Sequence, residues 1–173
     1  MLQQALCIAQ ENGEKYSEGL IYGDLGFAYR FLGDVCKAED CFKSSVKICD
    51  NLRDLMQSKD EWKISFRDLN KRFYSSLIVS QLEQHKTLEA LLTADRGRAQ
   101  ALMDLMESQY NVKTTSAIPE MQAETISFIS SPTIFVAQIP NSINFWVLKK
   151  GKKIEFVTKQ VDLNSLQSLT EEV

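Results

Sequence analysis

The sequence predicts a mainly α protein, in which an array of helical hairpins precedes a small, truncated α/β segment with a three-stranded meander. Two segments forty residues apart repeat one another: Leu2, Ala5, Leu6 and Ile8 are matched by Phe42, Ser45, Val46 and Ile48. A period of this size is typical of a helix pair that buries its apolar face by stacking on its neighbours. Beyond Pro132 the helical period gives way to short runs rich in Ile, Val, Phe and Trp, which are typical of strands.

One complete helical hairpin is expected from about Gly19 to Asp50. Its first helix carries an apolar stripe at three- and four-residue spacing, formed by Tyr22, Leu25, Gly26, Tyr29 and Leu32. Gly26 would let the second helix approach closely. Gly33 and Asp34 would supply the turn and a capping side chain. The matching stripe of the second helix is Ala38, Phe42 and Val46.

These residues resemble a tetratricopeptide repeat. The small, aromatic and alanine places of that motif are filled by Gly26, Tyr29, Ala38 and Phe42. The sequence departs from the motif at Ser45, which replaces the usual alanine, and at Asp50, which replaces the usual proline. The resemblance implies a tetratricopeptide-type array that binds a protein or peptide partner.

Partial units flank the complete one. Residues 1–13 are expected to form the second helix of a preceding unit. A longer amphipathic helix should follow, with Trp62, Phe66, Leu69, Phe73, Leu77 and Ile78 on one face, and another helical stretch runs from about Thr87 to Gln109. If His85-Lys86 is the turn that corresponds to Gly33-Asp34, then Ala90 corresponds to Ala38. The second hairpin would then have about a dozen extra residues in its connection or its first helix.

The composition changes at about residue 111, where a run rich in Thr, Ser, Ala and Pro indicates a linker. The helical period returns weakly over 121–129. Three strands are then expected over Thr133–Ile139, Ile143–Lys149 and Ile154–Val161, and a helix should open at Asp162. Without further strands, the segment Phe145–Leu148 would form a hydrophobic edge. The expected parts are thus helical repeats (1–110), a linker or helix (111–131) and an α/β segment (132–173).

This order of parts is similar to proteins that join tetratricopeptide repeats to a CHAT domain, a caspase-like module found in large animal proteins. The segments that carry the resemblance are Trp62-Lys63-Ile64-Ser65, residues 94–102 (ADRGRAQAL) and the runs Thr133–Val136, Ile143–Leu148 and Lys153–Phe156. One interpretation of Arg96 and Arg98 is that they tie the last array helix to the following domain.

The resemblance implies that an active CHAT peptidase would use a histidine and a cysteine late in the domain. This chain has one histidine, His85, and its four cysteines all precede the expected linker: Cys7, Cys36, Cys41 and Cys49. We therefore expect a non-catalytic interaction or adaptor module, encoded as a fragment. The alternatives are the recognition arm of a CHAT cysteine peptidase whose catalytic part is missing, and a structural scaffold or decaying gene copy.

The motif register predicts which residues face the concave groove of the array, namely Gly23, Asp24, Phe27 and Arg30. A peptide could lie against them. Asp24 occupies the place where repeats that grip a C-terminal carboxylate carry asparagine, so we do not expect a chaperone-tail ligand.

The bulk composition narrows the function classes. A net charge of −3 gives no reason to expect binding to nucleic acid or to a membrane surface. No apolar run approaches the roughly 20 residues of a membrane span, and we expect a cytoplasmic protein. The cysteines lack CxxC spacing, which favours reduced thiols packed on helices, with no metal or cofactor. The lysines around Gly151 could bind an anion, but are more typical of a soluble hairpin tip: Lys149, Lys150, Lys152 and Lys153.

Overall fold

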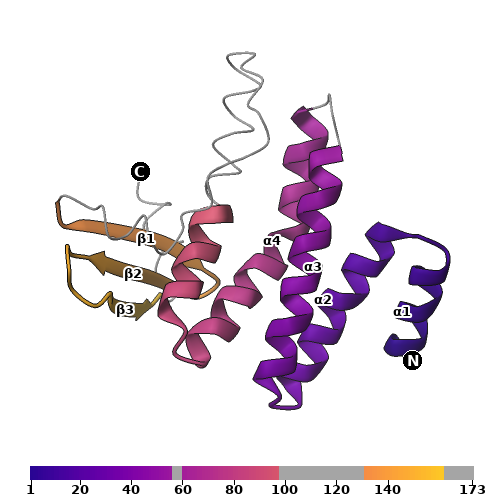
Figure 1. Cartoon of the computed structure of the whole chain (residues 1–173), viewed down its shortest axis with the longest axis horizontal. Coiled ribbons are helices and arrows are strands. Elements are labelled where there is room, and N and C mark those ends of the chain that lie inside the picture. The colour runs from indigo at the N-terminus through magenta and orange to yellow at the C-terminus, as the bar shows by residue number, and fades with distance from the viewer. Residues whose placement is uncertain (56–59, 98–130, 162–173) are drawn as a thin grey trace, which may run out of the picture. The chain divides into compact units, whose positions relative to one another are not determined.

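The computed structural model describes residues 1–55, 60–97 and 131–161, with the backbone alone at residue 54 and over 60–69. The chain divides into two compact units, Met1–Glu120 and Met121–Val173. The helical unit contains α1 (Leu2–Glu11), α2 (Lys15–Phe31), α3 (Val35–Leu55) and α4 (Asp60–Glu83), and residues 87–97 are also helical (Figure 1). The second unit contains an antiparallel sheet of β1 (Thr133–Ile139), β2 (Ser142–Leu148) and β3 (Glu155–Gln160). A mostly helical chain with a three-stranded meander is therefore confirmed.

Three helices of the helical unit end in the same turn. Gly13, Gly33 and His85 have positive φ, at 69°, 81° and 59°. After α2, the Gly33 N–H donates to the Arg30 carbonyl at 3.0 Å and the Asp34 N–H donates to the Tyr29 carbonyl at 2.9 Å. Equivalent pairs of bonds close α1 and α4. This is the Schellman motif, which satisfies carbonyl groups that the helix end leaves without partners.

The recurring turn fixes how the two described hairpins correspond. The next helix begins with a bond from the Ala38 N–H to the Asp34 carbonyl, and equally from the Ala90 N–H to the Lys86 carbonyl, each at 3.0 Å. Ala38 and Ala90 are both fully buried. The predicted equivalence of the two turns is thus confirmed, and part of the extra length is helix, since α4 has 24 residues and α2 has 17.

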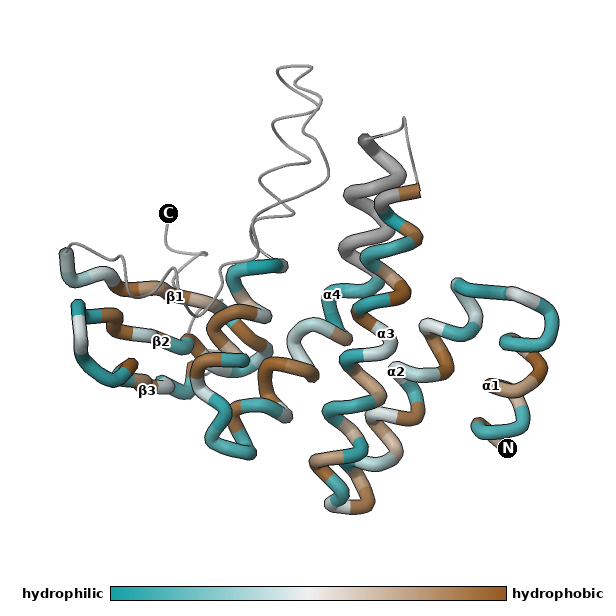
Figure 2. Tube along the Cα trace, viewed as in Figure 1, coloured by the Kyte–Doolittle hydropathy of each residue, from teal (hydrophilic) through white to brown (hydrophobic). Residues whose placement is uncertain are grey.

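A single apolar core joins α2, α3 and α4. Hydrophobic residues recur among hydrophilic ones along these helices (Figure 2). The buried members of the core cluster are Ala38, Phe42, Val46, Cys49, Phe73 and Leu77, and Leu20 and Tyr29 of α2 pack against it. A Cβ on Gly26 would lie 2.6 Å from the Phe42 ring, so the close approach predicted at this glycine is confirmed. The packing depends on a bare backbone there, because tightly packed interiors have no room for another methyl group.

The sheet has two faces of different exposure. On one face Trp146 is fully buried, with its ring 5.9 Å from that of Phe135 and 5.2 Å from that of Phe156. Trp146 pairs with Phe135 on β1 and with Phe156 on β3. The expectation of a hydrophobic edge at Phe145–Leu148 is therefore wrong. Two successive hairpins necessarily put the middle segment at the centre of the meander, where both of its sides are paired.

Several expectations lie outside the described residues. These are the linker, the weak helical period over 121–129, the helix opening at Asp162, the end of the helical stretch over 98–109, residue Arg98, and the side chains of Trp62, Phe66 and Leu69. The three strand predictions are confirmed to within one residue at each end.

Candidate functional site

The four groove residues predicted from the sequence lie on one side of α2, and this side packs against α4. We call this surface, made of Gly23, Asp24, Phe27 and Arg30 with their contacts on α4, the α2–α4 face. Gly23 is buried under the ring of Phe73, and a Cβ at this position would overlap the ring. Gly23 therefore contributes by letting α4 approach, while the other three side chains reach the surface.

Phe27 sits at the centre of the α2–α4 face. Its ring lies 5.1 Å from that of Phe42, edge to face, and 6.2 Å from that of Phe73, yet Phe27 is 36% exposed. One turn further along α2, Phe31 is 92% exposed. Side chains four residues apart on a helix are neighbours, so Phe27 and Phe31 form one short apolar strip, and Phe31 is counted with the α2–α4 face.

Two ion pairs flank Phe27. Arg30 on α2 lies 2.6 Å from Glu83 on α4, and Asp24 lies 3.9 Å from Arg72. The Arg72 guanidinium is also stacked on the Phe73 ring at 4.6 Å from its centroid, and lies 6.0 Å from that of Phe27. All four charged side chains are between 36% and 56% exposed. The strip is therefore bordered by fixed charges of both signs that a partner could reach.

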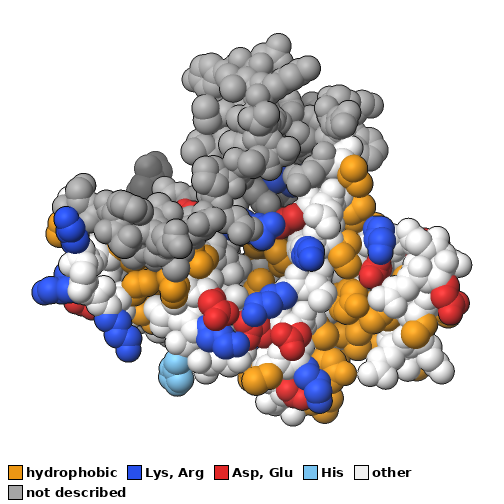
Figure 3. Space-filling view, in the orientation of Figure 1, with side chains coloured by type: hydrophobic (Ala, Val, Ile, Leu, Met, Phe, Trp, Pro, Cys, Tyr) orange, Lys and Arg blue, Asp and Glu red, His pale blue; other side chains and the backbone are white. Residues whose placement is uncertain are grey.

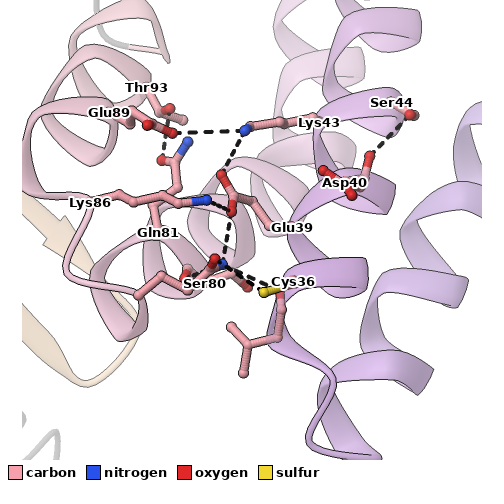
Figure 4. A network of polar contacts seen from close by, with 12 residues as sticks. Cys36, Glu39, Asp40, Lys43, Ser44, Ser80, Gln81, Lys86, Glu89 and Thr93 are labelled. Carbon is pink, nitrogen blue, oxygen red and sulfur yellow. Dashed lines mark hydrogen bonds and ion pairs between the residues drawn. The ribbon is translucent and has the colours of Figure 1, made fainter.

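A second polar cluster ties α3 to the turn after α4. Glu39 on α3 is 1% exposed, and its carboxylate lies 2.7 Å from Lys43 and 2.6 Å from Lys86 (Figure 4). The Gln84 amide donates to the same carboxylate at 2.8 Å. Burial opposes ionisation of Glu39, but the hydrogen bonds from Lys43 and Lys86 outweigh it and hold the pKa of this carboxyl below its usual value.

This cluster is best explained as a structural contact that holds the two hairpins together. Acidic and basic side chains gather together on the helical unit in the space-filling view (Figure 3), and Lys43 also lies 3.7 Å from Glu89. Each charge of the cluster faces an opposite one, and the central carboxylate is buried. The charged groups are therefore already paired within the protein and are poorly placed to bind a ligand.

Both departures from the tetratricopeptide motif have partners in the fold. Ser45 is fully buried, and its hydroxyl donates to the Gly19 carbonyl at 2.8 Å. Asp50 is 5% exposed, accepts a hydrogen bond from the Tyr74 hydroxyl and lies 2.8 Å from Arg96. Arg96 thus pairs with α3 of its own unit, and the interpretation that Arg96 and Arg98 tie the array to the following domain stays a prediction.

The described thiols and the histidine are spread over the helical unit. Cys49 is buried and Cys41 half-buried, as expected for packed thiols, whereas Cys7 and Cys36 are exposed, which corrects the expectation that all four are packed. Burial raises the pKa of Cys49 to about 11, so this thiol stays protonated at neutral pH and is a poor nucleophile. His85 is exposed in the turn after α4.

The sequence interpretation missed the α4 half of the α2–α4 face. Arg72 and Glu83 were not singled out, although aligning Gly33 with His85 puts Arg30 and Glu83 at nearly the same height in their helices. Opposite charges at matching heights of neighbouring first helices are the signal that could have found this pair.

Comparison of the chain with protein-family models, with curated proteins and with solved structures finds no match. None of the described helices is long and apolar enough to cross a bilayer. Within the described residues, no group of three or more His, Cys, Asp or Glu side chains could hold a metal ion. Function must therefore be argued from the surface of the fold itself.

Proposed function

We propose that the chain is a non-catalytic protein-interaction module of tetratricopeptide type, which binds a peptide segment of a cytoplasmic partner on the α2–α4 face. The observation that carries the proposal is the exposed Phe27 between two interhelical ion pairs, with the almost fully exposed Phe31 one turn further along α2. Aromatic side chains held rigidly beside charged groups are typical of protein-binding surfaces.

The repeated turn supports the tetratricopeptide part of the proposal. The same turn follows α2 and α4, which supports interpreting them as first helices of successive hairpins, and the Phe73 ring of α4 packs on Gly23 of α2. First helices that pack in this way present one continuous surface. The resemblance of the strand segments to the first strands of a CHAT domain belongs to the same proposal, and three consecutive strands are present where it predicts them.

The peptide would contact Phe27 and Phe31 with apolar side chains and the two ion pairs with polar groups. Since the described part of the array offers one such face, we expect modest affinity, with a Kd of about 10–100 μM, or −7 to −5.5 kcal/mol. Most of this free energy should come from the two rings, because exposed ion pairs contribute little.

The test is selection of binding peptides from a random 12-residue display library on the intact chain, followed by anisotropy titration of a selected peptide. Phe31→Ser is the key variant, because Phe31 is almost wholly exposed and its loss should leave the fold unchanged. The matched control is Leu55→Ser, which alters another exposed apolar residue, 74% exposed on α3.

We expect Phe31→Ser to weaken binding about tenfold, and Phe27→Ala together with Arg30→Ala to abolish it while circular dichroism remains helical. The control should bind as the parent chain does. If the selected peptides bind all four proteins equally, the α2–α4 face is not the binding surface and the proposal fails.

A further inference from the structure

We propose that the exposed face of the sheet is a second docking surface, and that it takes an acidic amphipathic helix of a partner protein. This surface, which we call the apolar sheet face, consists of Ile134, Val136, Phe145, Val147 and Val157. The inference concerns the second unit and does not depend on the function proposed for the helical unit.

The strand register brings these five side chains together. Ile134 lies opposite Val147, Val136 opposite Phe145, and Phe145 opposite Val157. Residues two apart in a strand point to the same side of a sheet, so all five share the face opposite Trp146. Ile134 is 63% exposed, Val136 45% and Val157 57%.

This much exposed apolar surface is unusual for a strand cluster. Antiparallel sheets that meet water on one side normally carry polar residues there, whereas here three neighbouring β-branched residues keep about half of their surface in water. Contiguous exposed apolar patches mark interaction sites. Three strands at about 4.8 Å spacing make a face about 10 Å wide, which matches the diameter of one helix.

The charges around the face indicate the chemistry of the occupant. The described part of the sheet unit carries five lysines and a single acidic residue, Glu155. Lys149 pairs with Glu155 at 2.8 Å at one end of the face, and Lys159 follows Val157 at the other end. Lys150, Lys152 and Lys153 surround the adjoining turn, where Gly151 has a φ of 67°. In the space-filling view, lysines and hydrophobic side chains both reach the surface of the sheet (Figure 3).

A basic border around an apolar centre requires an occupant with carboxylates around an apolar stripe. A second copy of the sheet is disfavoured, because it would bring lysines against lysines. An anionic bilayer shares the required charge, but Glu155 is 57% exposed beside the apolar residues and would be pressed against the lipid phosphates. A helix avoids this conflict, since it can place an uncharged residue opposite Glu155.

The geometry also sets the spacing of the acidic residues. Lys159 lies four residues from Glu155 along β3, which is about 13 Å. A helix rises 1.5 Å per residue and returns to the same side after two turns, so carboxylates seven residues apart, about 10.5 Å, would share one side of the helix and lie within reach of the lysines at the two ends of the face.

The test uses the intact chain and two synthetic 16-residue peptides. The acidic peptide carries glutamates seven residues apart and leucines along one face, and the control peptide has lysines in place of the glutamates. Fluorescence anisotropy should give binding of the acidic peptide with a Kd below about 100 μM and binding of the control at least about tenfold weaker. Vesicles of phosphatidylcholine and phosphatidylserine form the third arm.

Three variants locate the binding. Ile134→Thr together with Val157→Thr removes exposed apolar surface, while threonine still favours a strand. This double variant should weaken binding of the acidic peptide about fivefold or more. Lys159→Gln changes only an exposed side chain, and should weaken binding about threefold at low salt but little at high salt. Thr158→Ser lies on the other side of β3 and should have no effect.

Four results would overturn the proposal: no binding of the acidic peptide at 1 mM, equal binding of both peptides, unchanged affinity in both the double variant and Lys159→Gln, or binding to the anionic vesicles without binding to the peptide. Circular dichroism of the double variant reports whether the sheet is retained. If it is lost, the Lys159→Gln titration decides, since that substitution removes no packing.

Discussion

Gly33 and His85 hold the same left-handed backbone conformation at the ends of α2 and α4, with φ of 81° and 59°. Glycine adopts this conformation at no steric cost, whereas a residue with a Cβ is strained in it by about 1 kcal/mol. The second hairpin therefore carries local strain that the first one lacks.

His85→Gly should stabilise the helical unit by about 1 kcal/mol, because it removes this strain at an exposed site. Urea denaturation followed by circular dichroism measures the free energy of unfolding. The reciprocal variant Gly33→Ala should lower it by a similar amount. If His85→Gly proves neutral or destabilising, the histidine side chain must make a stabilising contribution that the turn geometry does not reveal.

The buried carboxylate of Glu39 connects α3 to the turn before residues 87–97, so its neutralisation should weaken the joint between the hairpins. Glu39→Gln leaves Lys43 and Lys86 without their partner and should cost about 2 kcal/mol at pH 7. This is less than for a fully buried pair, since the two lysines are 47% and 36% exposed. Glu89→Gln, which removes the 3.7 Å pair at a 49% exposed site, should cost less than about 0.5 kcal/mol.

The same carboxylate should make stability depend on pH. The pKa of Glu39 is lower in the fold than in the unfolded chain, where a glutamate titrates near 4.3. The contribution of the Glu39 carboxylate to the free energy of unfolding is therefore complete above that pH and is lost as the pH falls through the pKa of Glu39 in the folded chain. In denaturation curves from pH 7 to pH 3, the difference in the free energy of unfolding between the parent chain and Glu39→Gln should disappear. A constant difference between them would show that ionisation of Glu39 does not carry the effect.

The parts of the fold that follow from local pattern were accessible from the sequence. Helical spacing located α2 and α3, and Gly33 with Asp34 located the turn, because the Schellman motif and the helix cap depend on a few adjacent residues; the Lys37 N–H indeed donates to the Asp34 carboxylate at 3.1 Å. The equivalence of His85 with Gly33 also followed from spacing.

The partners across helices were not accessible in the same way. Glu39 and Lys86 are 47 residues apart, and Asp24 meets Arg72 beside the place where the Phe73 ring of α4 packs on Gly23 of α2. Such pairs depend on helix packing, which sequence spacing does not determine. The central place of β2 is different, since it follows from having two successive hairpins.

Gly23 tests how the α2–α4 face is assembled. Gly23→Ala should destabilise the helical unit by about 2 kcal/mol, because the new Cβ must displace the buried ring of Phe73 and overpacking costs about 1–3 kcal/mol. Gly97→Ala is the matched control, because its Cβ would meet the Tyr74 ring at an ordinary 3.6 Å. Since alanine favours a helix over glycine, this control should be neutral or slightly stabilising. Equal effects of the two variants would exclude close packing at Gly23 as the cause.

The four thiols should react in an order set by burial. Cys7 and Cys36 are exposed and should react with an aromatic disulfide reagent within minutes at pH 8, whereas burial raises the pKa values of Cys41 and Cys49, the latter to about 11. Since the thiolate is the reacting species, Cys49 should be labelled only when the helical unit opens. The labelling rate of Cys49 should rise with urea concentration in parallel with unfolding. The labelling rates of Cys7 and Cys36 should not change. Labelling of Cys49 as fast as Cys36 in native buffer would contradict the packing of α3 against α2 and α4.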